Sequence, residues 1–426
     1  MYLADSRRTS TSASAAAPAH GPGRSARIAG TVLALGTVSL ITDISSEMVT
    51  AVLPLYVVTA LGVSPLGFGL LDGVYNGASA AVRLLGGVLG DRGSGRHKAV
   101  AAAGYGLSAL GKPMLLLART VPLIGLVLAV DRIGKGLRTA PRDAMISLAT
   151  PPEQRGRAFG VHRAMDTAGA LTGPLLAFLI LRAAPGGYHA VFTVSSCVAA
   201  LGVLVLVLLV PGRLLGRSDP LPTTARLRLP ETLRLPGLRR IALCATLLGL
   251  ATVSDSFVYL LVQRRLDLGA GWFPLLPLGT ATAYLLLAVP LGSLGDRIGR
   301  RRTFVLGHTA LLGGYVLLLL RPGSGLPLAA AVLALHGLFY AASDGMLAAA
   351  TAETVPEERR GAGLALVGTG QAAGRFACSV VIGAMWSRWG DTTALAVMTG
   401  ALALAAAAAL RLLRPQPDHP VTEEAR

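Results

Sequence analysis

Long apolar stretches recur along the chain and are separated by short segments rich in arginine, glycine and proline. A helix needs about 20 mostly apolar residues to cross about 30 Å of hydrocarbon, and the stretches are of this length. They are continuously apolar rather than alternating with period two, which favours helices over a membrane β-barrel. The pattern predicts twelve transmembrane helices, at about 28–60, 66–89, 99–118, 122–148, 158–182, 188–211, 239–264, 272–294, 303–320, 326–350, 361–386 and 391–413.

Composition supports a membrane protein, because 53% of the 426 residues are hydrophobic and only 14% are charged. A net charge of +17 would suit a nucleic-acid partner, but the basic residues gather in alternate connections between the apolar stretches. By the positive-inside rule these connections are cytoplasmic, and an even number of spans then places both termini in the cytoplasm. We expect an all-α protein of the plasma membrane with no nucleic-acid partner.

A short basic loop occurs twice, each time between two long apolar stretches. The first copy carries Gly87, Asp91, Arg92 and Arg96, and the second carries Gly292, Asp296, Arg297 and Arg301. An offset of 205 residues relates Asp91 to Asp296, and the same offset relates the Arg-Gly pairs that begin at 155 and 360. Because one offset fits two separate loops, the sequence predicts duplicated halves, an organisation typical of transporters.

The loops divide the chain into five predicted parts. These are a disordered cytoplasmic tail over 1–27, a six-helix bundle over 28–211, a cytoplasmic linker over 212–238, a second six-helix bundle over 239–413 and a tail over 414–426. We expect a monomer that contacts the lipid bilayer and a small-molecule substrate.

The two loops resemble the signature of the major facilitator superfamily, Gly-x-x-x-Asp-Arg-x-Gly-Arg-Arg-Lys. The second copy fits better, because the first has two residues, Gly93 and Ser94, where one is usual. The resemblance implies two six-helix bundles related by a pseudo-two-fold axis. It also implies conformational gating, with Asp91 held near Gly361 and Asp296 near Gly156 in the outward-facing state.

Asp43 and Glu47 lie four residues apart within the first apolar stretch, so both side chains share one helical face. A charge at membrane depth costs at least about 2.5 kcal/mol, so each carboxylate should face a cavity or a cation. Burial disfavours the charged form, which suits groups that bind and release protons. One of the two could instead serve only packing.

The stretch over 122–148 supplies opposite charges, with Arg132 near the midplane and Lys135 on the same helical stripe. It resembles the Arg-x-x-Gln-Gly pattern of drug-proton antiporters. Lysine replaces glutamine here, and the added positive charge favours an anionic substrate. Arg138 and Arg142 lie nearer the cytoplasm, and we expect them to extend toward the membrane surface. The segments around Asp43 and Arg132 also resemble a bacterial and archaeal subgroup of exporters.

The stretch over 158–182 contains Gly169, Gly173 and Pro174, which resemble the antiporter motif of this helix. Glycines at this spacing permit close helix contact, although such spacing is also common in ordinary membrane packing. Asp166 lies about one turn after His162, at the entrance of this helix, and is predicted to pair with Arg132, Lys135 or Arg138.

Other charges within the apolar stretches leave two interpretations open. Asp72, Arg83 and Lys112 fit either internal salt bridges of the first bundle or a cavity. In the second half, Asp255 is the best candidate for a coupling group, because its stretch should mirror the first. His308 and His336 are not assigned. We expect the first half to carry most of the coupling chemistry and the second to supply an apolar wall.

The sequence therefore predicts a secondary transporter that works by alternating access. The preferred form is proton-coupled efflux of a drug-like or anionic compound, with no cofactor or metal and a proton gradient as energy source. Proton-coupled uptake by symport is the first alternative, and a non-transporting membrane sensor is the second. An enzyme is not expected, because no clustered nucleophile, redox motif or phosphate-binding Gly-x-x-x-x-Gly-Lys loop occurs.

Overall fold

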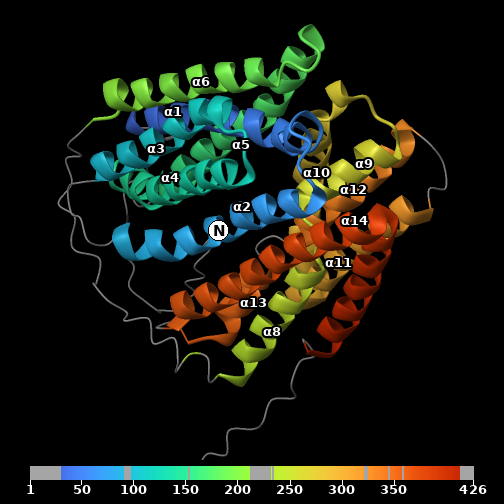
Figure 1. Ribbon diagram of the computed structural model, residues 1–426. Coiled ribbons are helices and arrows are strands. Elements are labelled where there is room, and N and C mark those ends of the chain that lie inside the picture. The colour runs from blue at the N-terminus through green and yellow to red at the C-terminus, as the bar shows by residue number, and fades with distance from the viewer. Residues whose placement is uncertain are drawn as a thin grey trace, which may run out of the picture.

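The computed structural model describes residues 30–90, 97–151, 154–211, 232, 235–320, 325–343, 346–356 and 359–412. Within these ranges the chain is almost entirely helical and has no strand, which confirms the all-α prediction (Figure 1). The elements are α1 (Gly30–Leu55), η1 (Tyr56–Ala60), α2 (Pro65–Gly90), α3 (His97–Leu117), α4 (Val121–Leu148), α5 (Arg155–Ala183), α6 (Tyr188–Leu209), α8 (Pro236–Ala251), α9 (Asp255–Arg265), η3 (Ala270–Trp272), α10 (Leu275–Ile298), α11 (Arg300–Leu320), α12 (Leu326–Ser343), α13 (Met346–Thr354) and α14 (Arg360–Leu412).

Some predicted features lie outside the described residues. They are the tails over 1–27 and 414–426, most of the linker over 212–238, and the first-loop residues Asp91, Arg92 and Arg96. Gly87 belongs to the last turn of α2.

In the described part of the chain, nine helical stretches are long and apolar enough to cross a membrane. α4 is not among them, because its 28 residues include six that are charged, from Asp131 to Asp143. α14 has 53 residues, and a straight helix of that length would measure about 80 Å. Its backbone departs from helical geometry at Gly390, where φ is 84° and ψ is 167°, and two arms fold back on each other there (Figure 1). The count of twelve spans stays a prediction.

A break between α8 and α9 positions one of the candidate residues. Thr252 ends α8 with extended backbone angles, and Ser254 precedes α9 with φ −67° and ψ 154°. Asp255 therefore stands in the first turn of α9, within the protein, instead of in the middle of a continuous helix.

Helices of the first half pack mainly with one another, and those of the second half do the same (Figure 1). Between the halves, α2 contacts α14 and α5 contacts α10. The repeat offset places α2 opposite α10, and α5 opposite the first arm of α14. The contact of α2 with α14 and that of α5 with α10 are therefore equivalent under the duplication that the loops indicate.

The two bundles meet at one end and diverge at the other (Figure 1). At the closed end, the Leu66 backbone N–H donates to Ser387 Oγ at 2.9 Å. Phe68 and Phe257 pack edge to face with ring centroids 4.9 Å apart, and Phe178 lies 5.4 Å from the Trp272 ring. The C-terminal end of α2 lies at the diverging end (Figure 1).

Glycines bring α3 and α4 into backbone contact. A Cβ atom added at Gly134 would lie 2.6 Å from both the Gly104 carbonyl oxygen and Ser108 Oγ. Gly134→Ala should therefore force the helices apart and cost about 1–3 kcal/mol of stability. Gly106→Ala is the matched control, because nothing lies within 4 Å of the added atom. Thermal unfolding in detergent measures both, and equal midpoints for the two variants would contradict this packing.

Candidate functional site

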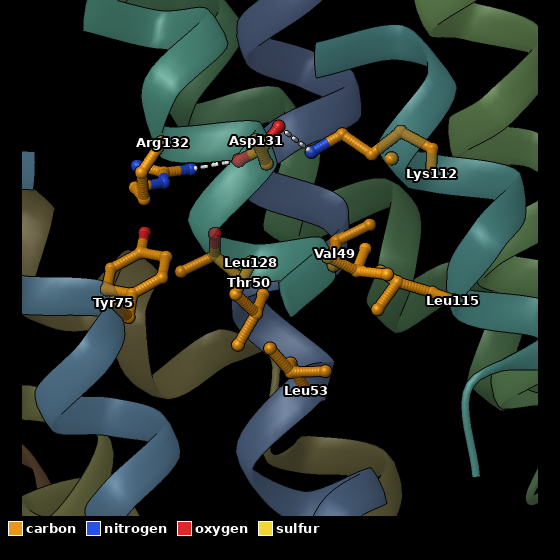
Figure 2. A pocket seen from close by; sticks show the side chains of 11 residues that line it. Val49, Thr50, Leu53, Tyr75, Lys112, Leu115, Leu128, Asp131 and Arg132 are labelled. Carbon is orange, nitrogen blue, oxygen red and sulfur yellow. Dashed lines mark hydrogen bonds and ion pairs between the residues drawn. The ribbon is translucent and has the colours of Figure 1, made fainter. Parts of the chain in front are cut away.

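A buried ion cluster joins α3 and α4. Asp131 Oδ1 accepts from Lys112 Nζ at 3.0 Å, and Asp131 Oδ2 accepts from Arg132 Nη2 at 2.6 Å. The Arg132 guanidinium carbon lies 4.3 Å from the centre of the Tyr75 ring. Figure 2 shows these four side chains beside a small pocket that is otherwise lined mainly by apolar residues. Two cations against one carboxylate leave the cluster with one excess positive charge.

Lys112 fits both interpretations that the sequence leaves open, because it pairs with Asp131 and also lines the small pocket. Lys112 forms an internal salt bridge with Asp131. Arg132 is only 7% exposed and is partly neutralised by its own neighbour, Asp131, which sequence reasoning did not select as a site residue. The sequence signal for Asp131 is a carboxylate directly beside a cation within an otherwise apolar stretch.

A second set of charges joins α1, α4 and α5. Asp43 Oδ1 lies 3.5 Å from Arg138 Nη2, and the Arg138 guanidinium lies 4.6 Å from the Tyr105 ring centre. Arg142 pairs with Asp143 at 2.9 Å and reaches Asp166 at 3.9 Å. The expectation that Arg138 extends to the membrane surface is wrong, because Arg138 is 3% exposed.

Asp166 does not form the ion pair that the sequence predicts. Its cationic contact is Arg142, and its carboxyl group lies close enough to the Asp43 carboxyl group for the two to interact electrostatically. The sequence could not indicate this contact, because Asp43 and Asp166 lie on helices far apart along the chain. The structure thus places the two carboxyl groups side by side, between α1 and α5.

Glu47 and Lys135 complete the first-half site. Both side chains are half-buried, and neither forms a hydrogen bond or ion pair with a side chain in the described ranges. The Lys135 charge nevertheless acts on the carboxylates of Asp43, Glu47 and Asp166. One anion and one cation therefore remain available for a ligand.

The glycine motif of α5 brings this site together. A Cβ atom at Gly169 would lie 2.5 Å from the Leu40 carbonyl oxygen, and one at Gly173 would lie 2.8 Å from Glu47 Cβ. Pro174 follows within the same helix. These glycines let α1 and α5 touch at the turns that carry Asp43 and Glu47, so the motif has a packing role that also positions the carboxylates.

The second half contains a hydrogen-bonded network around Asp255. Its Oδ1 accepts from Tyr340 Oη at 2.6 Å and lies 3.1 Å from His336 Nε2. The Arg375 charge acts on both Asp255 and Tyr340. The Asp255 side chain is 43% exposed, whereas that of His336 is 2% exposed. The centre of the second half is therefore more polar than the apolar wall that the sequence predicts.

The second basic loop does not contact α5 in this conformation. Asp296 is 72% exposed and lies 3.7 Å from Arg300, which also pairs with Glu353 at 2.8 Å. A Cβ atom at Gly156 or at Gly292 would meet nothing within 4 Å. The nearby Arg297 is exposed, and Arg301 donates to Thr354 Oγ1 at 3.3 Å. Gating by this loop stays a prediction for the state in which this end is closed.

Within the described ranges, no group of three or more His, Cys, Asp or Glu side chains is placed to hold a metal ion. The described site residues offer ion pairs, hydrogen bonds and proton exchange among carboxyl, imidazole and phenol groups.

Comparison with known proteins gives consistent matches. The sequence pattern of the Major Facilitator Superfamily matches residues 35–280 and 265–426. An uncharacterized MFS-type transporter of Methanocaldococcus jannaschii is 27% identical over 392 residues, which cover 88% of this chain and 94% of that protein. The multidrug resistance protein MdtH of Photorhabdus laumondii is 28% identical over 135 residues, 32% of this chain and 33% of that protein. The crystal structure of the nucleoside transporter NupG matches with a TM-score of 0.74 and 15% identity over 91% of this chain and 100% of that chain, a likeness of fold alone.

The ion cluster predicts unequal effects of removing its members. Asp131→Asn should cost about 3–5 kcal/mol of stability, because it leaves two buried cations without their anion. Lys112→Met should cost less, because Asp131 keeps Arg132 as its partner. Thermal unfolding in detergent, followed by thiol-dye reaction at the buried Cys244 and Cys378, measures both. A lower midpoint for Lys112→Met than for Asp131→Asn would show that the cluster is assigned incorrectly.

Proposed function

The chain belongs to the Major Facilitator Superfamily, and we propose that this multi-pass membrane transporter exports a drug-like organic compound in exchange for protons, with proton-coupled symport of an anionic compound as the alternative. We place it in the plasma membrane as a monomer with both termini in the cytoplasm. A partial likeness to a multidrug resistance protein supports export of drug-like molecules.

The observation that carries the proposal is the proximity of the carboxyl groups of Asp43 and Asp166, which both adjoin the cations of α4. Two neighbouring carboxylates repel each other when both are ionised, so a proton on one of them is favoured. Loss of that proton leaves two like charges in contact, which repel unless nearby cations move toward them. Arg138 and Arg142 contact this pair from α4, so binding and loss of the proton alter how α1, α4 and α5 fit together.

The direction of coupling depends on which free group binds the solute. A solute that donates a hydrogen bond or carries a cation would bind Glu47 in competition with a proton, and this competition produces exchange. An anion bound at Lys135 would instead withdraw the cation from the carboxylates and favour their protonation. That second arrangement produces symport, and the free Lys135 side chain is the observation that supports it.

The charge distribution supports an inward-facing state. The diverging end carries the basic α10–α11 connection with Arg297 and Arg300, which the positive-inside rule assigns to the cytoplasm. In this orientation the closed end faces outward and the diverging end faces the cytoplasm, the side from which an exporter takes up its solute. Both basic loops, with Asp91 and Asp296, would lock the cytoplasmic end after the bundles rock.

Asp43→Asn tests the proton site. Asn cannot exchange a proton, so proton-driven flux should fall to the level of empty liposomes while solute exchange at equal pH on both sides continues. The measurement is movement of ethidium and of carboxyfluorescein in proteoliposomes with and without a pH gradient. Asp267→Asn, in an exposed turn at φ 50°, is the matched control and should retain flux. Full gradient-driven flux in Asp43→Asn would rule out this proton site.

Glu47→Gln and Lys135→Gln separate the two forms of coupling. Glu47→Gln should weaken binding of the cationic probe ethidium, and Lys135→Gln should weaken binding of the anionic probe carboxyfluorescein. A loss of one favourable ion contact corresponds to roughly tenfold in affinity. Binding titrations on purified protein measure this, and an equal effect of both variants on both probes would refute the assignment of separate subsites.

A further inference from the structure

Asp72 connects the two bundles at the closed end. It lies on α2 and is 6% exposed, and its Oδ2 accepts from Ser379 Oγ at 2.6 Å. Ser379 belongs to the first arm of α14, in the other bundle. The hydroxyl groups of Ser254 and Ser256 lie beside the same carboxyl group. Among the described residues Asp72 forms no salt bridge within the first bundle, and its hydrogen-bond partner from another helix belongs to the second bundle.

The surroundings of Asp72 are unusual for a buried carboxyl group. In the described part of the chain no lysine or arginine forms an ion pair with it, and the charged side chain that acts on it is Asp255, which is also acidic. Asn76 Nδ2 donates at 3.3 Å from the next turn of α2. All its other partners are hydroxyl groups of the opposite bundle, so Asp72 is held by contacts between the bundles.

The N-terminal end of α9 also attracts the Asp72 carboxyl group. Ser254 precedes this 11-residue helix but makes no capping hydrogen bond, and its buried Oγ has no partner that meets hydrogen-bond geometry. The exposed N–H groups of a helix start carry partial positive charge and favour a nearby anion. The Asp72 carboxyl group stands at this place, close to Ser254 and Ser256.

The backbones of α2 and α14 lie in close contact around Asp72. A Cβ atom at Gly73 would lie 3.1 Å from the Phe376 ring, and one at Gly383 would lie 3.2 Å from Gly69 Cα. Opening this end separates α2 from α14, whose backbones touch at Gly69 and Gly383. Every contact that Asp72 makes with the other bundle is then lost together.

We propose that Asp72 is a latch that holds the two bundles together at this end, docked on Ser379 and on the start of α9. The latch presumes alternating access, as the proposed function does. It also adjoins the solute site, because Asp255 stands between Ser254 and Ser256 and carries the network of His336 and Tyr340. A ligand or proton at Asp255 that shifts the first turn of α9 changes the docking surface of Asp72.

The test measures opening directly. Spin labels at Ala183→Cys and Ala270→Cys, with Cys197, Cys244 and Cys378 replaced by serine, report the distance between α5 and η3 at the closed end. These elements contact each other and lie away from the contact of α2 with α14. Asp72→Ala and Ser379→Ala should each raise the ratio of open to closed protein by roughly tenfold. The double variant should add little to Asp72→Ala, because both changes remove the same contact.

Ser387→Ala is the matched control, because it removes an exposed hydrogen bond between the same helices, to the Leu66 backbone. It should change the ratio less than about twofold. If Asp72→Ala does not fold, Asp72→Asn and Ser379→Ala provide the same comparison with little change in shape. Distances in Ser379→Ala and in either Asp72 variant that equal those of the control would overturn the latch. No solute is needed, so this result is independent of whether the protein exchanges protons for the probes.

Discussion

Charge within a membrane is the constraint on which the whole arrangement depends. Each isolated charge at membrane depth costs at least about 2.5 kcal/mol, so a helix such as α4, with six charged residues, cannot face lipid alone. Its neighbours α1, α3 and α5 supply the opposite charges through Asp43, Lys112 and Asp166. The helices packed around α4 therefore pair with its charged side chains, and the apolar faces of these helices meet the lipid.

Glycine residues allow these ion pairs to form, because the pairs need short distances between helix axes. Gly104 and Gly134 bring α3 against α4, while Gly169 and Gly173 bring α1 against α5. A larger side chain at these places would separate the charged groups and leave them unpaired in a medium of low dielectric constant. Among the described residues, Glu47 and Lys135 form no hydrogen bond or close ion pair with another side chain, which is a costly state for structural residues but a suitable one for groups that bind solute and protons.

The fold can be predicted from the sequence because the length of each apolar stretch and the charge of each loop can be read directly along the chain. Period, length and the repeated basic loop were enough to predict an all-α membrane protein of this family. Side-chain partners depend on the approach of helices that are distant in sequence. The contact of Asp72 with Ser379, 307 residues away, and that of His336 with Asp255 have no local signal. Arg138 was misjudged because its distance along α4 suggested the membrane surface, whereas α1 and α3 cover it.

In the proposed exchange, solute and proton cross the membrane in opposite directions through one site. Internal pH recorded in wild-type proteoliposomes loaded with ethidium and diluted into ethidium-free buffer tests this most directly. Export of the probe in exchange for protons predicts that the lumen acidifies as ethidium leaves, at a rate that rises with the ethidium gradient. A lumen that becomes alkaline, or whose pH does not change while ethidium leaves, would contradict exchange.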